Sequence, residues 1–347
     1  MKKRFDYARA GVNIDIADEA KQKIKSMVKA TFTPGVLSEI GKFGGFFSLE
    51  HLKYKNPVFI SSVDGVGTKL KVASMMNKFD TVGIDLINHC ADDILVHGAR
   101  PLFFLDYIAM AKTTPKVVGE IVKGLVTACK AEKCALIGGE TAQMPDVYKG
   151  NDFDFVGLVV GVVEKDKIID GRNIKAGDKI IGLKSTGLHT NGYTLARKLF
   201  FDKAGLKAKT YVKKLKTTVG KALLAPHKSY TKSVFKLIDS IDVKGLAHIT
   251  GGGFTDNIPR ILPEGVSVVI EKKSWKPLPI FTMMAELGNL EDSEMYRTFN
   301  MGIGMCVFVA EKDLKKAMKI LRAGKAGPVV IGEVVKSRNG AKKVEIV

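Results

Sequence analysis

Three short segments place a carboxylate beside a predicted strand or a buried helical stripe. Asp64 ends an apolar run and opens the turn Asp64-Gly65-Val66-Gly67-Thr68-Lys69, Asp93 lies in a predicted helix, and Glu140 follows an apolar run and two glycines. A carboxylate beside buried apolar residues is costly unless it is paired or binds a cation. Oxygen-only sites suit Mg²⁺ and nucleotide phosphates rather than Zn²⁺. We therefore predict that Asp64, Asp93 and Glu140 converge at one edge of a sheet as a Mg²⁺ site.

The turn from Asp64 to Lys69 matches neither common phosphate-binding pattern. Thr68 precedes Lys69, so the segment is not a Walker A loop, and no third glycine follows Gly65 and Gly67 at the dinucleotide-binding distance. Backbone N–H groups at the start of the following helix suit a phosphate. An ordinary strand-to-helix turn explains the same residues, so both interpretations stay open.

Two glycine-containing loops in the second half of the chain form a further candidate site. One runs from Thr186 to Tyr193 and contains His189, and the other runs from His248 to Phe254 and contains three consecutive glycines. His189 could act as an acid, a base or a phosphate ligand, although a loop histidine is more often structural. Glycines allow the backbone to approach a ligand closely. The sequence lacks a Gly-x-Ser-x-Gly elbow, so covalent nucleophilic catalysis is not supported.

Strand-like and helical runs alternate along the chain, which predicts an α/β or α+β fold. A turn-rich stretch between residues 164 and 178 predicts two α/β domains, residues 1–168 and 169–347. The run Phe155–Val163 is nearly continuous in apolar residues, which predicts a strand buried on both faces. The predicted strands are residues 58–63, 102–110, 135–137, 155–163, 179–183, 267–271, 302–310 and 328–335. The predicted helices are residues 17–30, 84–96, 115–131, 193–200, 228–238 and 312–321.

Composition excludes several classes of protein. A chain of 347 residues with 46% apolar and 26% charged residues is typical of a folded protein of about two domains. The longest apolar stretch is about half of a membrane span, and no secretory signal is evident, so no membrane partner is expected. The four cysteines form no CxxC pair, which favours a reducing, cytoplasmic compartment.

The net charge of +19 is the one unusual property of the composition. Such a charge suggests a polyanion partner or a lysine-rich solvated surface. The densest basic stretch, residues 203–244, spreads its lysines singly among apolar residues and has no RNP-like aromatic pattern. We therefore expect a solvated surface and no nucleic-acid partner.

The order and spacing of the motifs resemble the phosphoribosylformylglycinamidine cyclo-ligase (aminoimidazole ribonucleotide synthetase) family over essentially the whole chain. The motifs that carry the resemblance are residues 6–15, 64–69, 101–107, 138–142, 161–164, 189–193, 248–254 and 297–300. The resemblance implies an N-terminal α/β domain that dimerises through its sheet and a C-terminal α/β sheet-and-helix domain. It also implies a cytoplasmic homodimer that binds ATP and Mg²⁺, with nucleotide contacts from both subunits.

The same resemblance implies closure of an imidazole ring in purine biosynthesis. ATP phosphorylates the formamide oxygen of formylglycinamidine ribonucleotide to an iminophosphate, the amidine nitrogen attacks that carbon, and phosphate leaves. The implied catalytic residues are Asp64, Lys69, His189 and Asn191. The implied nucleotide-binding residues are Lys25, Gly44, Gly45, Asp64, Gly65, Gly67, Thr68, Lys69, Asp93, Gly139, Glu140 and Thr141, of which Asp64, Asp93 and Glu140 would hold the metal. The implied substrate-binding residues are His189, Thr190, Asn191, His248, Gly251, Gly252 and Gly253.

Other ATP-dependent members of the same superfamily are the nearest alternatives. A selenophosphate synthetase would need a reactive cysteine near its N-terminus, and the first cysteine here is Cys90. A thiamine-monophosphate kinase would share the acidic motifs but not the segments 187–193 and 297–300. The chain also departs from the family pattern, because Asp92 stands where Asn is common and adds charge beside the predicted metal site.

Overall fold

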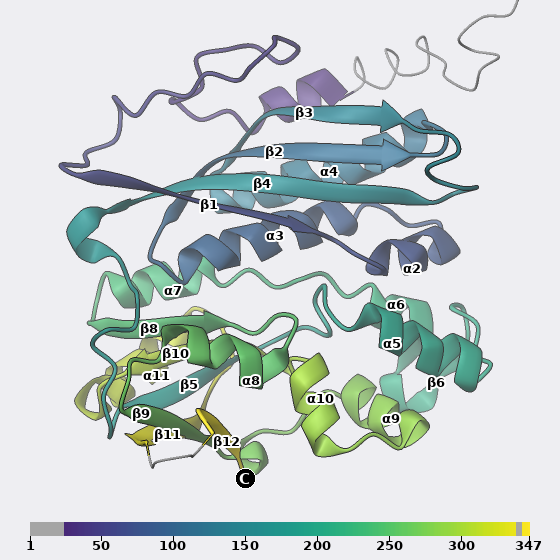
Figure 1. Cartoon of the computed structure of the whole chain (residues 1–347). Coiled ribbons are helices and arrows are strands. Elements are labelled where there is room, and N and C mark those ends of the chain that lie inside the picture. The colour runs from purple at the N-terminus through teal and green to yellow at the C-terminus, as the bar shows by residue number, and fades with distance from the viewer. Residues whose placement is uncertain (1–23, 338–341) are drawn as a thin grey trace, which may run out of the picture. The chain divides into compact units, whose positions relative to one another are not determined.

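A computed structural model describes residues 24–337 and 342–347 (Figure 1). The motif at residues 6–15 and the first part of the helix predicted at 17–30 lie outside the described residues, and residues 24–29 are helical. The chain forms two compact units. Unit 1 comprises residues 1–91 and 101–162, and unit 2 comprises residues 92–100 and 163–347. This mixture of helices and sheets confirms the predicted fold class of two α/β domains.

Unit 1 contains a four-stranded sheet in the order β1-β4-β2-β3. The strands are β1 (Pro57–Gly65), β2 (Arg100–Met110), β3 (Ala135–Gln143) and β4 (Phe153–Glu164), and the helices are α2 (Lys69–Met76), α3 (Val82–Leu95) and α4 (Pro115–Glu132). The last residues of α3, from Asp92 onward, belong to unit 2. Strands β2 and β3 are parallel and joined by α4, which starts with Pro115 at a position where a missing N–H costs nothing. Helices α3 and α4 cover one face of the sheet (Figure 1).

The burial of β4 shows that one prediction was wrong, namely that this strand is buried on both faces. Along β4, residues 155–160 alternate between buried and half-buried, so the strand is not buried on both faces in its first half. In the described part of the chain, helices α3 and α4 cover one face of the sheet, and the residues of β4 that alternate with the buried ones are only half-buried. On the edge strand β1, Phe59 and Val63 are 56% and 62% exposed.

Unit 2 contains a six-stranded sheet in the order β12-β9-β11-β5-β10-β8. Its strands are antiparallel, except that β12 pairs with β9 in parallel. The strands are β5 (Lys179–Lys184), β8 (Val243–His248), β9 (Val266–Ile270), β10 (Ile303–Val309), β11 (Pro328–Lys336) and β12 (Val344–Ile346). Helices α7 (Thr231–Ile238) and α11 (Leu314–Ala323) pack on the sheet, where Val234, Phe235 and Leu321 join its core.

The smaller elements of unit 2 lie between these strands. They are β6 (Tyr211–Val212), β7 (Thr217–Thr218), α5 (Tyr193–Arg197), α6 (Val219–Leu223), α8 (Gly253–Asn257), α9 (Pro279–Gly288) and α10 (Asp292–Thr298), and a π-helix continues α5 through Lys198–Lys203. All the predicted strands are present, but the sequence analysis missed β8 and β12 of the six-stranded sheet and the short strands β6 and β7. Lys244 of β8 sits in an otherwise apolar strand because the ammonium group pairs with Asp178 at 2.7 Å. Among the described helices, none combines the length and the hydropathy of a membrane span.

Candidate functional site

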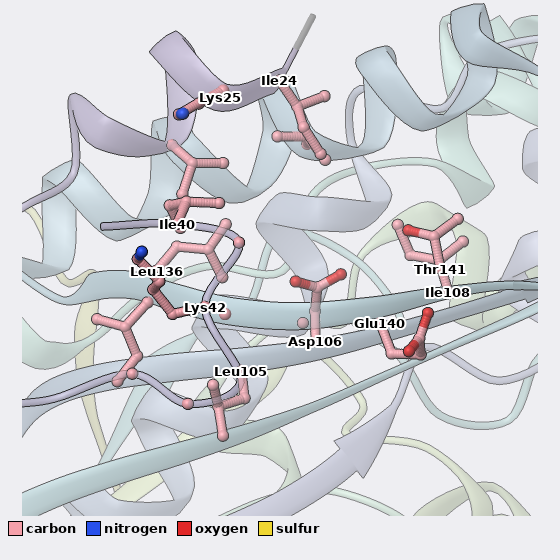
Figure 2. A pocket seen from close by; sticks show the side chains of 18 of the residues that line it. Ile24, Lys25, Ile40, Lys42, Leu105, Asp106, Ile108, Leu136, Glu140 and Thr141 are labelled. Carbon is pink, nitrogen blue, oxygen red and sulfur yellow. The ribbon is translucent and has the colours of Figure 1, made fainter. Parts of the chain in front are cut away.

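A cavity of about 630 Å³ opens in unit 1 (Figure 2). It lies between the helical segment at residues 24–29, the loop at residues 40–45, and strands β2 and β3. A volume of this size is typical of a small-molecule site. The cavity brings together half of the residues predicted to bind a nucleotide, namely Lys25, Gly44, Gly45, Gly139, Glu140 and Thr141.

Asp106 is a cavity residue that the sequence analysis did not single out. Its side chain points from β2 into the cavity (Figure 2), and it pairs in register with Gly139 of β3. Desolvation among apolar neighbours raises the pKa of Asp106 to about 7. A carboxylate inside an otherwise apolar strand was the available signal, because such a group is costly there without a partner or a ligand.

Because Gly139 has no side chain, the Asp106 carboxyl group can occupy the space beside it. A Cβ at Gly139 would lie 2.3 Å from Asp106 Oδ1 and 2.8 Å from the Asp106 carbonyl oxygen. We therefore expect Gly139→Ala to displace Asp106 and to weaken binding of the ATP predicted from the sequence by about 10-fold or more, which corresponds to at least about 1.4 kcal/mol. Calorimetric titration with Mg·ATP measures the effect.

The matched control for this prediction is Gly119→Ala in helix α4, where an added Cβ meets nothing within 4 Å. This variant should bind ATP normally and gain about 0.5–1 kcal/mol of stability from the helix propensity of alanine. Unchanged ATP affinity in Gly139→Ala would show that Asp106 is not placed by this contact.

The structure does not bring Asp64 and Glu140 together within unit 1. Asp64 lies on β1 and Glu140 on β3, at opposite edges of a four-stranded sheet. With strands about 4.8 Å apart, these two edges are separated by roughly 14 Å. Asp64 Oδ2 instead lies 3.0 Å from Nε2 of His89, whose side chain is 3% exposed. Asp93 belongs to unit 2.

The turn after Asp64 forms as predicted and is followed by helix α2. Gly67 has a φ of +66°, a conformation that glycine adopts readily, and α2 begins at Lys69, directly after Thr68. The Gly65 N–H donates a hydrogen bond to Asp64 Oδ1 at 2.6 Å.

Lys69 lies inside unit 1. Its side chain is 0% exposed, and its Nζ lies 2.8 Å from Oδ1 of the equally buried Asp85. Burial lowers the pKa of Lys69, and the charge of Asp85 opposes this effect. The ion pair connects the first turn of α2 to the first turn of α3. A contact of Lys69 with phosphate would therefore require this ion pair to open.

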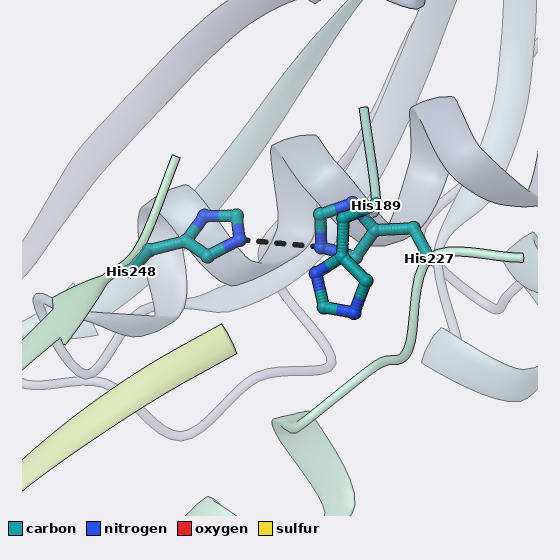
Figure 3. Close-up of side chains that lie close together, drawn as sticks. All are labelled: His189, His227 and His248. Carbon is teal, nitrogen blue, oxygen red and sulfur yellow. Dashed lines mark hydrogen bonds between the residues drawn. The ribbon is translucent and has the colours of Figure 1, made fainter. Parts of the chain in front are cut away.

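Three histidines of unit 2 converge, two of which were predicted site residues (Figure 3). His189 lies in the loop after β5 and stacks on His227, with 3.9 Å between the ring centroids. His227 Nε2 lies 3.2 Å from Nε2 of His248, at the end of β8. His248 Nδ1 lies 2.8 Å from Asp93 Oδ1. The sequence analysis missed His227, because a single histidine between Pro226 and Lys228 carries no motif.

The remaining predicted substrate residues gather beside a second cavity of unit 2, of about 390 Å³. The Asn191 amide donates to Thr190 Oγ1 at 3.3 Å, and a Cβ at Gly251 would lie 3.1 Å from Asn191 Oδ1, so the two glycine-containing loops adjoin. The cavity is lined by Gly192, Gly251, Gly252, Asp256, Glu294, Arg297 and Thr298.

Gly253 holds its loop against helix α10. It has a φ of +57°, and an added Cβ would lie 1.9 Å from the Tyr296 carbonyl oxygen. We expect Gly253→Ala to be more destabilising than Gly265→Ala by at least about 1 kcal/mol, because a backbone carbonyl must move. Gly265 is the matched control, since its φ is +77° and nothing lies within 4 Å of an added Cβ. Equal unfolding free energies in urea would contradict this packing.

The chain matches two family descriptions along most of its length. Residues 52–163 match "AIR synthase related protein, N-terminal domain", and residues 175–345 match the C-terminal domain of the same family. A phosphoribosylformylglycinamidine cyclo-ligase of Geotalea uraniireducens is 48% identical over 344 residues, which are 99% of each chain. The corresponding protein of a Thermoanaerobacter species is 50% identical over 336 residues, 97% of this chain and 99% of the relative.

Solved structures with a similar fold are more distant in sequence. A thiamine-monophosphate kinase from Stenotrophomonas maltophilia has a TM-score of 0.67 at 15% identity, over 93% of this chain and 95% of its own. The hydrogenase maturation protein HypE in complex with ATP has a TM-score of 0.67 at 14% identity, over 94% of this chain and 91% of its own. At such identities the similarity establishes the fold alone.

Proposed function

This chain belongs to the phosphoribosylformylglycinamidine cyclo-ligase family, and from that premise we propose that it closes the imidazole ring of formylglycinamidine ribonucleotide with ATP. The products are 5-aminoimidazole ribonucleotide, ADP and phosphate. The observation that carries the proposal is an identity of 48–50% over at least 97% of both chains. The cavity of unit 1 supports it, because half of the predicted nucleotide residues line that one space.

The chemistry explains why ATP is needed. A formamide oxygen is a poor leaving group, and its phosphorylation gives an iminophosphate from which phosphate can depart. The amidine nitrogen attacks the same carbon and closes the ring. Most of the catalysis then consists of positioning the reactants and stabilising charge at the transferred phosphoryl group.

We assign nucleotide binding to the cavity of unit 1. Lys25 supplies a positive charge at its rim, and the glycines of the loop at residues 40–45 let the backbone approach the nucleotide. Mg²⁺ fits the donor chemistry, because Glu140 and Asp106 contribute carboxylates and the lining includes neither histidine nor cysteine. When bound, Mg²⁺ neutralises phosphate charge. A cation beside Asp106 would also stabilise the ionised form that desolvation disfavours.

Asp64 and Asp93 stay in the proposed Mg²⁺ set on the strength of the family resemblance, which implies nucleotide contacts from both subunits. Within one chain Asp64 lies at the opposite edge of the sheet from Glu140, so we propose that the two contact the same nucleotide from different subunits. Asp64 retains partial exposure, with 39% of its side chain accessible, although His89 contacts one of its oxygens. Asp93 is 28% accessible at the side chain, although His248 contacts its Oδ1. Both carboxylates are therefore held in place by a histidine and still reach solvent.

We assign the ribonucleotide substrate to the glycine-containing loops of unit 2. His189 and Asn191 lie on one loop, and His248 begins the other. His189 has a φ of +64°, which is strained for a residue with a side chain and is typical of functional loops. Arg297 lines the cavity beside these loops and adds a cation that could bind the phosphate of the ribonucleotide.

We further propose a cytoplasmic homodimer that forms through the uncovered face of the unit 1 sheet. Phe59 and Val63 are large apolar side chains on that sheet, and their exposure of more than half favours burial against a second copy. The four cysteines are all free, as expected in a reducing compartment.

The test incubates the purified protein with formylglycinamidine ribonucleotide, ATP and Mg²⁺ and follows aminoimidazole ribonucleotide, ADP and phosphate together. We expect equal release of all three, and loss of all three in Asp64→Asn and Glu140→Gln. ADP release without ring closure would overturn the proposed substrate. Phosphorylation of thiamine monophosphate in a parallel assay would instead favour the kinase activity of the structural relative.

A further inference from the structure

The histidine cluster of unit 2, defined by His189, His227 and His248, offers three imidazole donors, and the roles proposed for His189 and His248 in substrate binding do not account for His227. The three residues are 1%, 1% and 6% exposed. One ring nitrogen from each lies within 4.8 Å of those of the other two (Figure 3). They come from the loop after β5, the loop before α7 and the end of β8, so the tertiary fold alone brings them together.

The nitrogen spacing in this cluster is close to that of a tetrahedral metal site. Two imidazole nitrogens at 2.0–2.1 Å from one Zn²⁺ ion lie about 3.3 Å from each other. The Nε2 atoms of His227 and His248 are already 3.2 Å apart. The His189 ring stacks on His227 and must turn out of the stack to direct its nitrogen to the same point. One of its nitrogens lies within 4.8 Å of the ligand nitrogens of the other two histidines.

Two carboxylates at the end of helix α3 support the cluster. Asp93 Oδ1 contacts His248 Nδ1 at 2.8 Å, which leaves Nε2 directed at His227. Such carboxylate–histidine pairs orient and strengthen histidine ligands in metal sites. Asp92 is 0% exposed, and its Oδ2 lies 3.6 Å from His227 Nε2, which places an oxygen beside the cluster as a fourth donor. Asp92 Oδ1 accepts a hydrogen bond from the Tyr230 N–H at 3.1 Å, which holds this orientation.

We propose that His189, His227 and His248 bind one divalent transition-metal ion of the Zn²⁺ class, with Asp92 as the fourth ligand and Asp93 as the group that orients His248. Three imidazoles and a carboxylate suit Zn²⁺, Co²⁺ or Ni²⁺. Mg²⁺ prefers oxygen ligands, so this nitrogen-rich site is distinct in chemistry from the carboxylates assigned to Mg²⁺. Asp93, which contacts His248 through Oδ1, is the residue that the two proposed sites share.

The test titrates Co²⁺ into the chelator-treated full chain in the absence of nucleotide and substrate. We expect one equivalent to bind with the visible absorption of a tetrahedral nitrogen-and-oxygen site. Zn²⁺ should displace the Co²⁺, and a millimolar excess of Mg²⁺ should not. Because neither ATP nor the ribonucleotide is present, the result does not depend on whether the chain performs the proposed cyclisation.

Variants identify the ligands. His227→Gln should weaken Co²⁺ binding by at least about 100-fold, and Asp92→Asn by about 10–100-fold, as is usual for a supporting carboxylate. The matched control is His51→Ala, an exposed histidine that contacts Phe47 outside the cluster. His51→Ala should bind Co²⁺ as the natural chain does. If His227→Gln does not fold, His189→Gln serves in its place.

Three results would each overturn the metal site. They are the lack of a tetrahedral Co²⁺ spectrum in the natural chain, displacement of Co²⁺ by Mg²⁺, and equal affinity in folded His227→Gln. The histidines would then form a hydrogen-bonded and stacked network without a metal.

Discussion

Replacing Asp106 by Asn should lower kcat/KM for ATP by roughly 10²–10³-fold while making the protein more stable at pH 8. The loss of activity follows from removing a carboxylate of the cavity assigned to Mg²⁺ and phosphate. The gain in stability follows from removing a charge that the fold desolvates. Steady-state kinetics and thermal unfolding measure the two effects.

The pH dependence of this stability difference has a defined sign. The pKa of Asp106 is raised from its ordinary value of 3.8 to about 7 in the folded chain, so the folded state binds the proton more tightly. The stabilisation of the folded state by the protonated Asp106 carboxyl is complete below pH 3.8 and is lost as the pH rises through about 7. The stability advantage of Asp106→Asn should therefore be small at pH 4 and grow to on the order of a few kcal/mol at pH 8.

The control for this prediction is Asp166→Asn, an exposed carboxyl in the turn Lys165–Lys167. It should alter neither kcat/KM nor the pH dependence of unfolding. Normal activity in Asp106→Asn would remove this residue from the proposed site. A constant stability difference between pH 4 and pH 8 would show that Asp106 is not desolvated.

Replacing Lys69 by Met should destabilise the protein by about 3–5 kcal/mol, because Asp85 would then remain buried without the Lys69 ammonium. Circular dichroism during urea denaturation measures the change. The double variant Lys69→Met/Asp85→Leu should recover most of the loss, since a buried ion pair can often be replaced by apolar residues of similar volume at little cost.

The control is an exposed ion pair of similar geometry. Lys272 Nζ lies 2.6 Å from Asp292 Oδ2, and the two side chains are 38% and 66% exposed. Lys272→Met should therefore cost less than about 1 kcal/mol. The opposite result would be a Lys69→Met variant as stable as Lys272→Met but with weak ATP binding. That result would identify Lys69 as a phosphate ligand, as the sequence motif suggests.

The sequence by itself predicted the alternation of strands and helices, because side-chain periodicity along a segment reports directly on which face it buries. Strands β8 and β12 were the exceptions in the two large sheets. The lysine of β8 interrupts the apolar pattern and pairs with Asp178, 66 residues away in the chain. The sequence also identified the family, because motifs over the whole chain keep their order and spacing. The sequence analysis also predicted six of the residues that line the unit 1 cavity, because a glycine or a carboxylate next to a strand end can be recognised within a short segment.

Only the tertiary structure decided which of these residues share a site. Strand order is not encoded in any local pattern, so the sequence analysis could not place Asp64 and Glu140 at opposite edges of one sheet. Burial of Lys69 depends on Asp85, 16 positions away on the next helix. The contact of His227 with His248 joins residues on separate segments of unit 2, and neither segment alone indicates the other. Interactions between distant segments determine charge pairing, desolvation and ligand geometry, and these are the properties on which the chemistry of this protein depends.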